Sequence, residues 1–136
     1  MTTIEEHKKS IQALEQDVNE KIRDNILFER QKIVGFDVSE AATNLFELYL
    51  HKKNLITEGF NVNHRFFSSM KRAEEKFSFD FPEKPKILEY LVSTEQLTTK
   101  LCYGKSKKLE DVESAIKLFF GLKNLIEKQI GNIDKM

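Results

Sequence analysis

The sequence predicts an all-α fold, an antiparallel bundle of four long helices plus one shorter helix. Three observations favour this class: the 136 residues include only five glycines and two prolines, apolar residues recur at helical spacing over long stretches, and the polar positions are rich in Lys and Glu. Hydrophobic residues make up 40% of the chain, which is enough for one core, and no linker or internal repeat divides it. We therefore expect a single domain over residues 1–136.

The first helix is expected to run from residue 2 or 3 to about residue 34. Thr3 followed three residues later by Glu6 is typical of a capping box at a helix start, and we expect Gly35 to end or kink the helix. A narrow apolar stripe recurs along it in steps of four and seven. Because such a stripe suits contact with one other helix, within the chain or across a dimer, the sequence predicts a homodimer. The stripe consists of Ile4, Ile11, Leu14, Val18, Ile22, Ile26 and Ile33.

The second helix is expected to start at a capping box formed by Asp37 and Glu40 and to end near Gly59. It is apolar around most of its circumference, so it should lie at the centre of the bundle. A third, shorter helix over residues 63–77 follows, with Asn61 or Asn63 as its N-cap.

The fourth helix is expected over residues 84–103, because Pro82 and Pro85 bracket a helix start and Gly104 supplies a stop. The fifth should span residues 109–131. The side chains predicted to form the core are Leu45, Phe46, Tyr49, Leu88, Leu91, Leu97, Ile116, Phe119 and Phe120.

Composition limits the classes of function. The 22 basic and 22 acidic residues balance, which argues against a strongly basic nucleic-acid binder but leaves room for a local basic patch. The single cysteine, Cys102, excludes an intrachain disulfide. No apolar run is long enough to span a bilayer, and the N-terminal stretch has no apolar segment typical of secretion. We therefore expect a cytoplasmic protein without membrane contact.

Metal and cofactor motifs are missing. His7, His51 and His64 share no helical pairing, and the chain has no HExxH motif and no Glu-x-x-His pair. Glycine-rich phosphate loops are also missing. The sequence therefore predicts no metal site and no cofactor.

The joint between the fourth and fifth helices carries an aromatic residue, a glycine and a cluster of lysines. In one interpretation Tyr103 covers the core, Gly104 takes a left-handed conformation, and the lysines stabilise the negative helix end. In the other, Tyr103 stacks on a base and the lysines pair with phosphate. His64 and Arg65 join this site only if the third helix runs back along the bundle. The candidate RNA- or nucleotide-binding residues are Lys100, Tyr103, Lys105, Lys107, Lys108, His64 and Arg65.

Three segments resemble the archaeal HEPN-like proteins: the run SEAATNLFELYL at residues 39–50, the connection GFNVNHR at 59–65, and the helix end LCYG at 101–104. The resemblance implies a helical bundle that often dimerises. It also implies a role as a toxin or as the partner of a small nucleotidyltransferase.

The catalytic signature of that family is an Arg followed after four to six residues by a His, near the junction of the last two long helices, where the pair cleaves RNA without a metal. The equivalent junction here, residues 98–105, contains neither residue. We assign no catalytic residues. The sequence therefore favours a non-enzymatic interaction module, with a nucleotidyltransferase or a toxin–antitoxin-type partner implied by the resemblance. RNA or nucleotide binding at a basic end of the bundle, or an atypical ribonuclease, stays open as an alternative.

Overall fold

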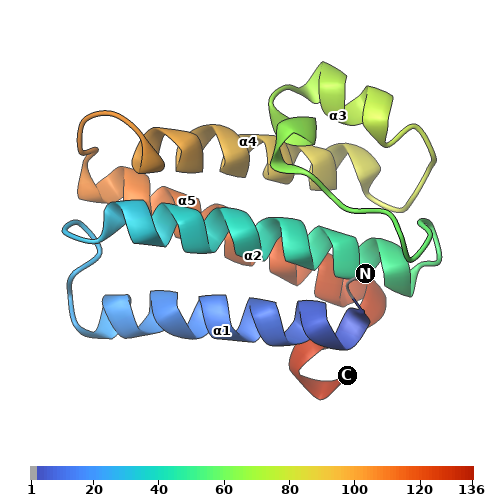
Figure 1. Cartoon of the computed structure of the whole chain (residues 1–136), viewed down its shortest axis with the longest axis horizontal. Helices are drawn as coiled ribbons and strands as arrows, with labels where there is room; N and C mark the ends of the chain where they lie inside the picture. The colour runs from blue at the N-terminus through green and yellow to red at the C-terminus, as the bar shows by residue number, and fades with distance from the viewer. Residues whose placement is uncertain (1–2) are drawn as a thin grey trace.

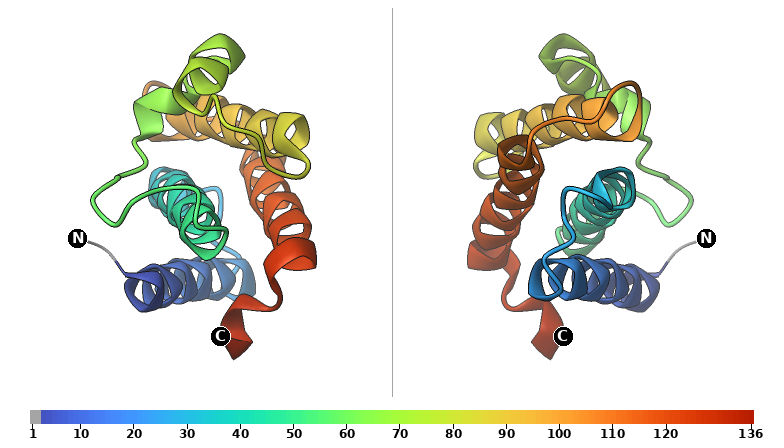
Figure 2. Two further views of the ribbon diagram at one scale, coloured as in Figure 1. Left: turned by 90° about the vertical axis from the view of Figure 1, so that its right-hand side faces the viewer. Right: turned by 90° about the vertical axis from the view of Figure 1, so that its left-hand side faces the viewer.

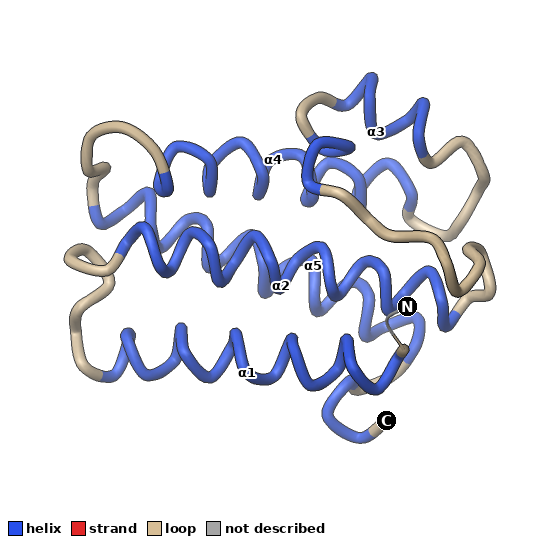
Figure 3. Tube along the Cα trace, in the orientation of Figure 1, coloured by secondary structure: helices blue, strands red, loops and turns tan. Residues whose placement is uncertain are grey.

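The computed structural model describes residues 3–136, and its regular structure is helical (Figures 1 and 3). No strand occurs among these residues, so the predicted all-α class is confirmed. The long helices are α1 (Ile4–Arg23), α2 (Gln31–Lys52), α4 (Lys84–Cys102) and α5 (Leu109–Ile130); the shorter elements are α3 (Met70–Lys76) and the 3₁₀ turns η1 (His64–Phe67) and η2 (Ile133–Lys135). Nowhere in residues 3–136 does a helix combine the length and apolar character needed to cross a membrane.

Helix α2 lies at the centre of the molecule. It packs against α1, α4 and α5, as the end-on views in Figure 2 show. Fourteen of its 22 residues are buried, so it has almost no solvent-facing side along its second half. The predicted central position of this helix is confirmed.

The prediction of one helix over residues 2–34 is wrong, because the chain turns back between α1 and α2. Helix α1 ends at Arg23, and Asn25 takes a left-handed conformation with φ of +57°. Asn adopts that region more readily than most residues, so the Asp24-Asn25 pair ends the helix. The predicted capping box is confirmed, since the Thr3 hydroxyl accepts from the Glu6 N–H. The alternative start at Thr2 lies outside the described residues.

The prediction that Gly35 ends the first helix is wrong, because Gly35 lies buried inside α2. A Cβ atom at this position would lie 3.0 Å from Leu101 Cβ and 3.1 Å from Cys102 Sγ. The glycine therefore lets the end of α4 approach the backbone of α2. The predicted start at Asp37 is also wrong, because α2 begins at Gln31 and Asp37 is buried within it.

The predicted third helix is two elements. Asn63 caps η1 by accepting from the Arg65 N–H at 2.8 Å, and Ser69 caps α3 by accepting from the Arg72 N–H at 3.1 Å. The second cap restarts the chain in a new direction, so α3 packs beside α4 (Figure 1). The predicted stop of α4 before Gly104, which has φ of +83°, is confirmed.

The core is rich in phenylalanine. Phe46 of α2 is fully buried and meets Phe77 and Phe67 edge-on, with ring centroids 5.0 and 5.9 Å away. Of the predicted core residues, Leu97 and Phe120 are only partly buried. The other seven are buried: Leu45, Phe46, Tyr49, Leu88, Leu91, Ile116 and Phe119.

Candidate functional site

The α4–α5 joint lies at the same end of the molecule as the α1–α2 connection (Figure 1). The buried Gln31, at the start of α2, holds it there through two hydrogen bonds. Its Nε2 donates to the Lys107 carbonyl at 3.1 Å, and its Oε1 accepts from the Lys107 N–H at 2.7 Å. The position of the joint is therefore fixed by backbone contacts that leave most of its side chains in solvent.

Tyr103 is 73% exposed, so the expectation that it covers the core is wrong. The physical reason is its extended backbone, with φ of −128° and ψ of 147°, which takes the residue out of the last turn of α4. Lys100, Lys105 and Lys108 are exposed as well. Lys107 is partly buried, and its ammonium group donates to the Lys105 carbonyl at 2.6 Å.

Large apolar side chains gather at this end of the bundle. Among the described residues, six such side chains are at least 41% exposed, and all of them belong to the ends of α1 and α4, the starts of α2 and α5, or the α1–α2 connection. Exposed apolar groups that are gathered, rather than scattered singly, mark interaction sites. We call this set the apolar end surface: Ile22, Phe28, Ile33, Phe36, Tyr103 and Leu109.

His64 and Arg65 do not join the basic joint. Helix α4 returns directly after α3, and η1 packs against α4 (Figure 1). His64 contacts Glu40 of α2 and Glu95 of α4, and Glu95 lies two turns before the end of α4. Arg65 is exposed on the same short turn. The seven candidate residues of the sequence therefore divide into two separate groups.

His64 lies in a hydrogen-bond network. Its Nε2 donates to Glu40 Oε1 at 2.6 Å, and its Nδ1 lies 2.9 Å from Ser39 Oγ and 3.2 Å from Glu95 Oε2. The hydrogen bonds to Glu40 and then to Glu95 raise the pKa of His64 to about 9. The ring is therefore protonated at neutral pH, and it cannot accept the proton of Ser39 as a general base. This Ser–His–Glu arrangement joins η1 to α2 and α4 instead of activating a nucleophile.

The His64 network predicts a specific pH dependence of stability. Its folded pKa lies above the value near 6.5 in the unfolded chain, so its contribution is complete below about pH 6.5 and is lost as the pH rises through 9. Because the ring is 32% exposed, we expect a screened loss of about 1 to 2 kcal/mol. Denaturant unfolding across this window should show wild type losing that much stability relative to His64→Gln. Parallel profiles for the two proteins would contradict the assignment.

A cleft of about 300 Å³ connects this network to a second polar cluster. Its walls come from α1, α2 and residues 61–64. Glu40 and His64 of the first network line it, and so do His7 and Glu47 of the second cluster. His7 and Glu47 are almost completely buried, at 3% and 5% exposure. Burying an ionisable side chain costs free energy unless a charged partner or a metal ion compensates it, so each of these two residues should have such a partner.

The second cluster consists of His7 from α1 with Glu47 and His51 from α2, one turn apart. His7 Nε2 contacts Glu47 Oε2, and His51 Nε2 lies 3.9 Å from the same oxygen. The two imidazole rings stack with centroids 5.9 Å apart. From the sequence, Glu47 has no predicted role and no metal site is expected. The signal that could have revealed the cluster is a Glu and a His at i,i+4 on a helix that is apolar around most of its circumference.

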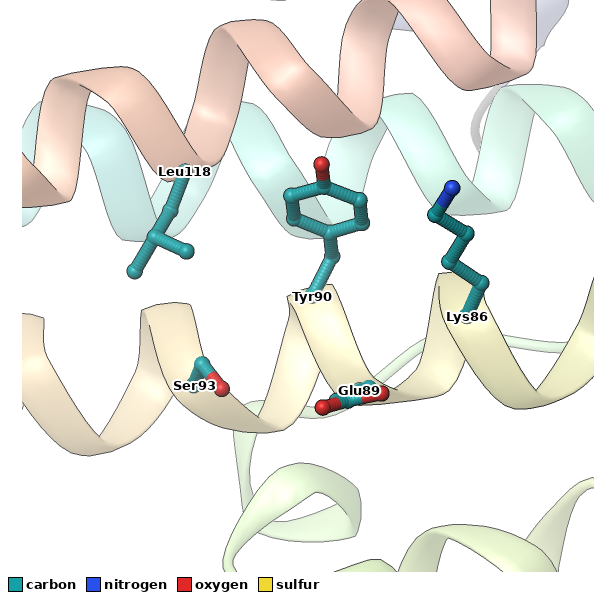
Figure 4. Close-up of a pocket in the computed structure, with 5 residues that line it drawn as sticks. All are labelled: Lys86, Glu89, Tyr90, Ser93 and Leu118. Carbon is teal, nitrogen blue, oxygen red and sulfur yellow. The ribbon is translucent and has the colours of Figure 1, made fainter.

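Another cavity, of about 220 Å³, lies between α4 and α5 (Figure 4). Lys86 and Tyr90 point from α4 toward α5, and Leu118 points back. A Cβ atom on Gly121 would come within 2.8 Å of the Tyr90 ring, so the glycine makes room for this tyrosine. The charged lining residues, Lys86 and Glu89, come from one face of a single helix, which gives the cavity few converging polar groups.

Comparisons of the chain with protein-family models, with curated proteins and with solved structures found no match.

Proposed function

We propose that this protein is a non-enzymatic helical interaction module that docks a partner protein through the apolar end surface. The observation that supports this most is the gathering of the six large exposed apolar side chains at one end of the bundle. A folded helical domain normally buries such residues or scatters them singly. Aromatic side chains, of which this surface has Phe28, Phe36 and Tyr103, contribute most to protein interfaces.

Charge favours a partner different from the chain itself. In residues 22–36 and 100–111, basic residues outnumber acidic ones. A two-fold contact between two copies would bring like charges together, whereas an apolar surface with an acidic rim would complement this end. Ile11 and Val18, from the stripe that predicted a homodimer, are buried within their own chain. The homodimer stays a prediction, but the stripe no longer supports it, because its buried residues already have partners within their own chain.

The resemblance to archaeal HEPN-like proteins gives the proposal a finer form. It would make the four long helices an antiparallel bundle of that type and the partner a small nucleotidyltransferase or a toxin–antitoxin-type protein. The lack of Arg and His in residues 98–105 supports a non-catalytic role. The surroundings of His64 also support it. The Glu40 and Glu95 carboxylates lie on both sides of the protonated ring and repel an RNA phosphate.

Site-specific photo-crosslinking in the source cell tests the proposal. A photoreactive phenylalanine analogue replaces Phe36 or Tyr103, and the control places it at Lys71, which is exposed on α3. We expect the same protein adduct from positions 36 and 103 and its absence from position 71. Adducts that are equally abundant at all three positions, or absent from all three, would contradict a docking surface at this end.

RNA binding is the second candidate, because Tyr103 is 73% exposed between Lys100 and Lys105. A solvent-facing tyrosine can stack on a base while neighbouring lysines contact the backbone. Arg65 and His64 lie away from this group and should contribute little.

Replacing Lys105, Lys107 and Lys108 together with Ala should weaken binding of single-stranded RNA by at least about tenfold and lower the salt dependence, because each lost phosphate contact removes about one released counterion. The measurement is a fluorescence anisotropy titration at low and moderate salt. The matched control replaces Lys52, Lys71 and Lys86, which are exposed elsewhere. If wild type does not bind at low salt, or if both triple variants bind equally, the lysines of the joint only solvate a helix end.

A further inference from the structure

His7, Glu47 and His51 form a cluster with the chemistry of a transition-metal site. One ligand atom from each residue can be chosen so that all lie within 4.8 Å of one another. Two imidazoles and one carboxylate are the ligand set of many catalytic Zn²⁺ sites, which leave a fourth position open. The three come from two packed helices, since Glu47 and His51 share one face of α2 and His7 faces them from the first turns of α1.

The neighbouring hydrogen bonds orient the ligand atoms. Asn44 donates its Nδ2–H to the Glu40 carbonyl at 2.8 Å, which directs its Oδ1 at His7. His7 Nδ1 lies 2.8 Å from that oxygen and must donate to it. The lone pair of a neutral His7 is therefore on Nε2, directed at Glu47. Such a hydrogen bond to the second ring nitrogen is the usual way in which proteins orient a metal-binding histidine.

Glu47 is oriented in the same way. Its Oε1 accepts from the Val62 N–H at 2.6 Å, which leaves Oε2 directed at the two histidines. A neutral imidazole lone pair opposite a carboxylate oxygen is repulsive, so the centre requires a positive charge. Within residues 3–136, the Nε2 atoms of both His7 and His51 are buried and have no partner that meets hydrogen-bond geometry.

We propose that His7, Glu47 and His51 bind one Zn²⁺ ion, with a fourth position that opens to the cleft of about 300 Å³. Bonds of about 2.0–2.1 Å in a tetrahedron place ligand atoms roughly 3.3 Å apart. The 3.9 Å separation between His51 and Glu47 is close to this value, and the His7–Glu47 contact must open to admit the ion. The site does not depend on the apolar end surface, which lies at the opposite end of α1 and α2.

The competing explanation is a buried ion pair between protonated His7 and Glu47. It accounts for the His7–Glu47 contact but leaves the buried Nε2 atom of His51 without a role. Zinc accounts for all three side chains and for both orienting hydrogen bonds.

The test uses the full-length protein stripped with a chelator and then dialysed against a small excess of Zn²⁺. We expect one Zn²⁺ per chain by elemental analysis and a rise in the thermal unfolding midpoint of roughly 5 °C or more at saturating metal. Titration with Co²⁺ should give visible absorption of tetrahedral intensity. His51→Gln and Glu47→Gln should each weaken Zn²⁺ binding at least tenfold, whereas His64→Gln, which removes an imidazole outside the cluster, should bind as wild type does.

Removal of His7 or Glu47 from the core can prevent folding, which circular dichroism would reveal. In that case the His51→Gln variant is the one that tests the site. The His51 side chain is 10% exposed, and the two orienting hydrogen bonds belong to His7 and Glu47, so this substitution removes neither of them. Wild-type protein that binds no stoichiometric Zn²⁺, or a folded His51→Gln variant that binds as tightly as wild type, would overturn the site. Destabilisation by His7→Gln without any effect of Zn²⁺ on wild type would establish the buried ion pair in its place.

Discussion

Phe46→Ala is expected to lower the free energy of unfolding by about 3 to 5 kcal/mol. Phe46 is fully buried at the centre of the aromatic cluster, where Tyr49, Phe67, Phe77 and Phe81 contact its ring. Truncation removes apolar area from the core and leaves a cavity that four bulky neighbours cannot readily fill. Equilibrium denaturation in urea measures the loss.

The matched control is Phe36→Ala on the same helix. Phe36 is 57% exposed, so the same change of side chain should cost less than about 1 kcal/mol. Equal losses for the two variants would show that the burial of Phe46 does not determine its contribution.

Gly35→Leu should destabilise the protein by about 1 to 3 kcal/mol, because it overpacks the contact between α2 and the end of α4. Even a Cβ atom here would crowd Leu101 Cβ at 3.0 Å and the Thr98 carbonyl at 3.3 Å. Gly35→Ala should be close to neutral, since the gain of about 1 kcal/mol in helix propensity offsets that crowding. Thermal or chemical unfolding distinguishes the variants.

Gly59→Leu provides the control, because a Cβ atom there would meet nothing within 4 Å. If Gly35→Leu were as stable as Gly59→Leu, the close approach of α4 to α2 would be wrong.

The all-α class and the central helix were predictable because they depend on periodicity, which burial enforces along whole elements. The α1–α2 turn was not, because apolar residues continue at helical spacing through residues 26–33. The conformation of Asn25 outweighs that pattern. An asparagine is a weak signal of such a turn in this chain, because Asn25 and Asn54 take the left-handed conformation while other asparagines lie within helices or cap them.

This one error hid the His7–Glu47–His51 cluster and the part of the apolar end surface that α1, α2 and their connection contribute. In the α1–α2 hairpin, His7 meets Glu47, and Asp17, ten residues further along α1, meets Asp37, ten residues earlier on α2. If one continuous helix ran to residue 34, α1 and the first turn of α2 would not lie antiparallel with this pairing. The predicted helix therefore could not place His7 beside Glu47. Likewise the sequence predicts that Ile22 and Ile33 belong to a stripe in contact with another helix, within the chain or across a dimer, whereas both are exposed at the end of the bundle.

Affinity capture from the source cell with three forms of the protein tests whether the apolar end surface docks a partner. The forms are wild type, a Phe36→Ser/Tyr103→Ser variant, and a control variant carrying Lys71→Ser and Lys86→Ser on exposed positions elsewhere. Loss of the two most exposed aromatic side chains of this surface should reduce binding by at least about tenfold, since an aromatic anchor of an interface contributes about 2 kcal/mol or more. We predict one near-stoichiometric partner with wild type and the control, and its loss with the double variant, which circular dichroism should show to be folded. Capture of the same proteins in the same amounts by all three forms would contradict the assignment of the apolar end surface as a docking site.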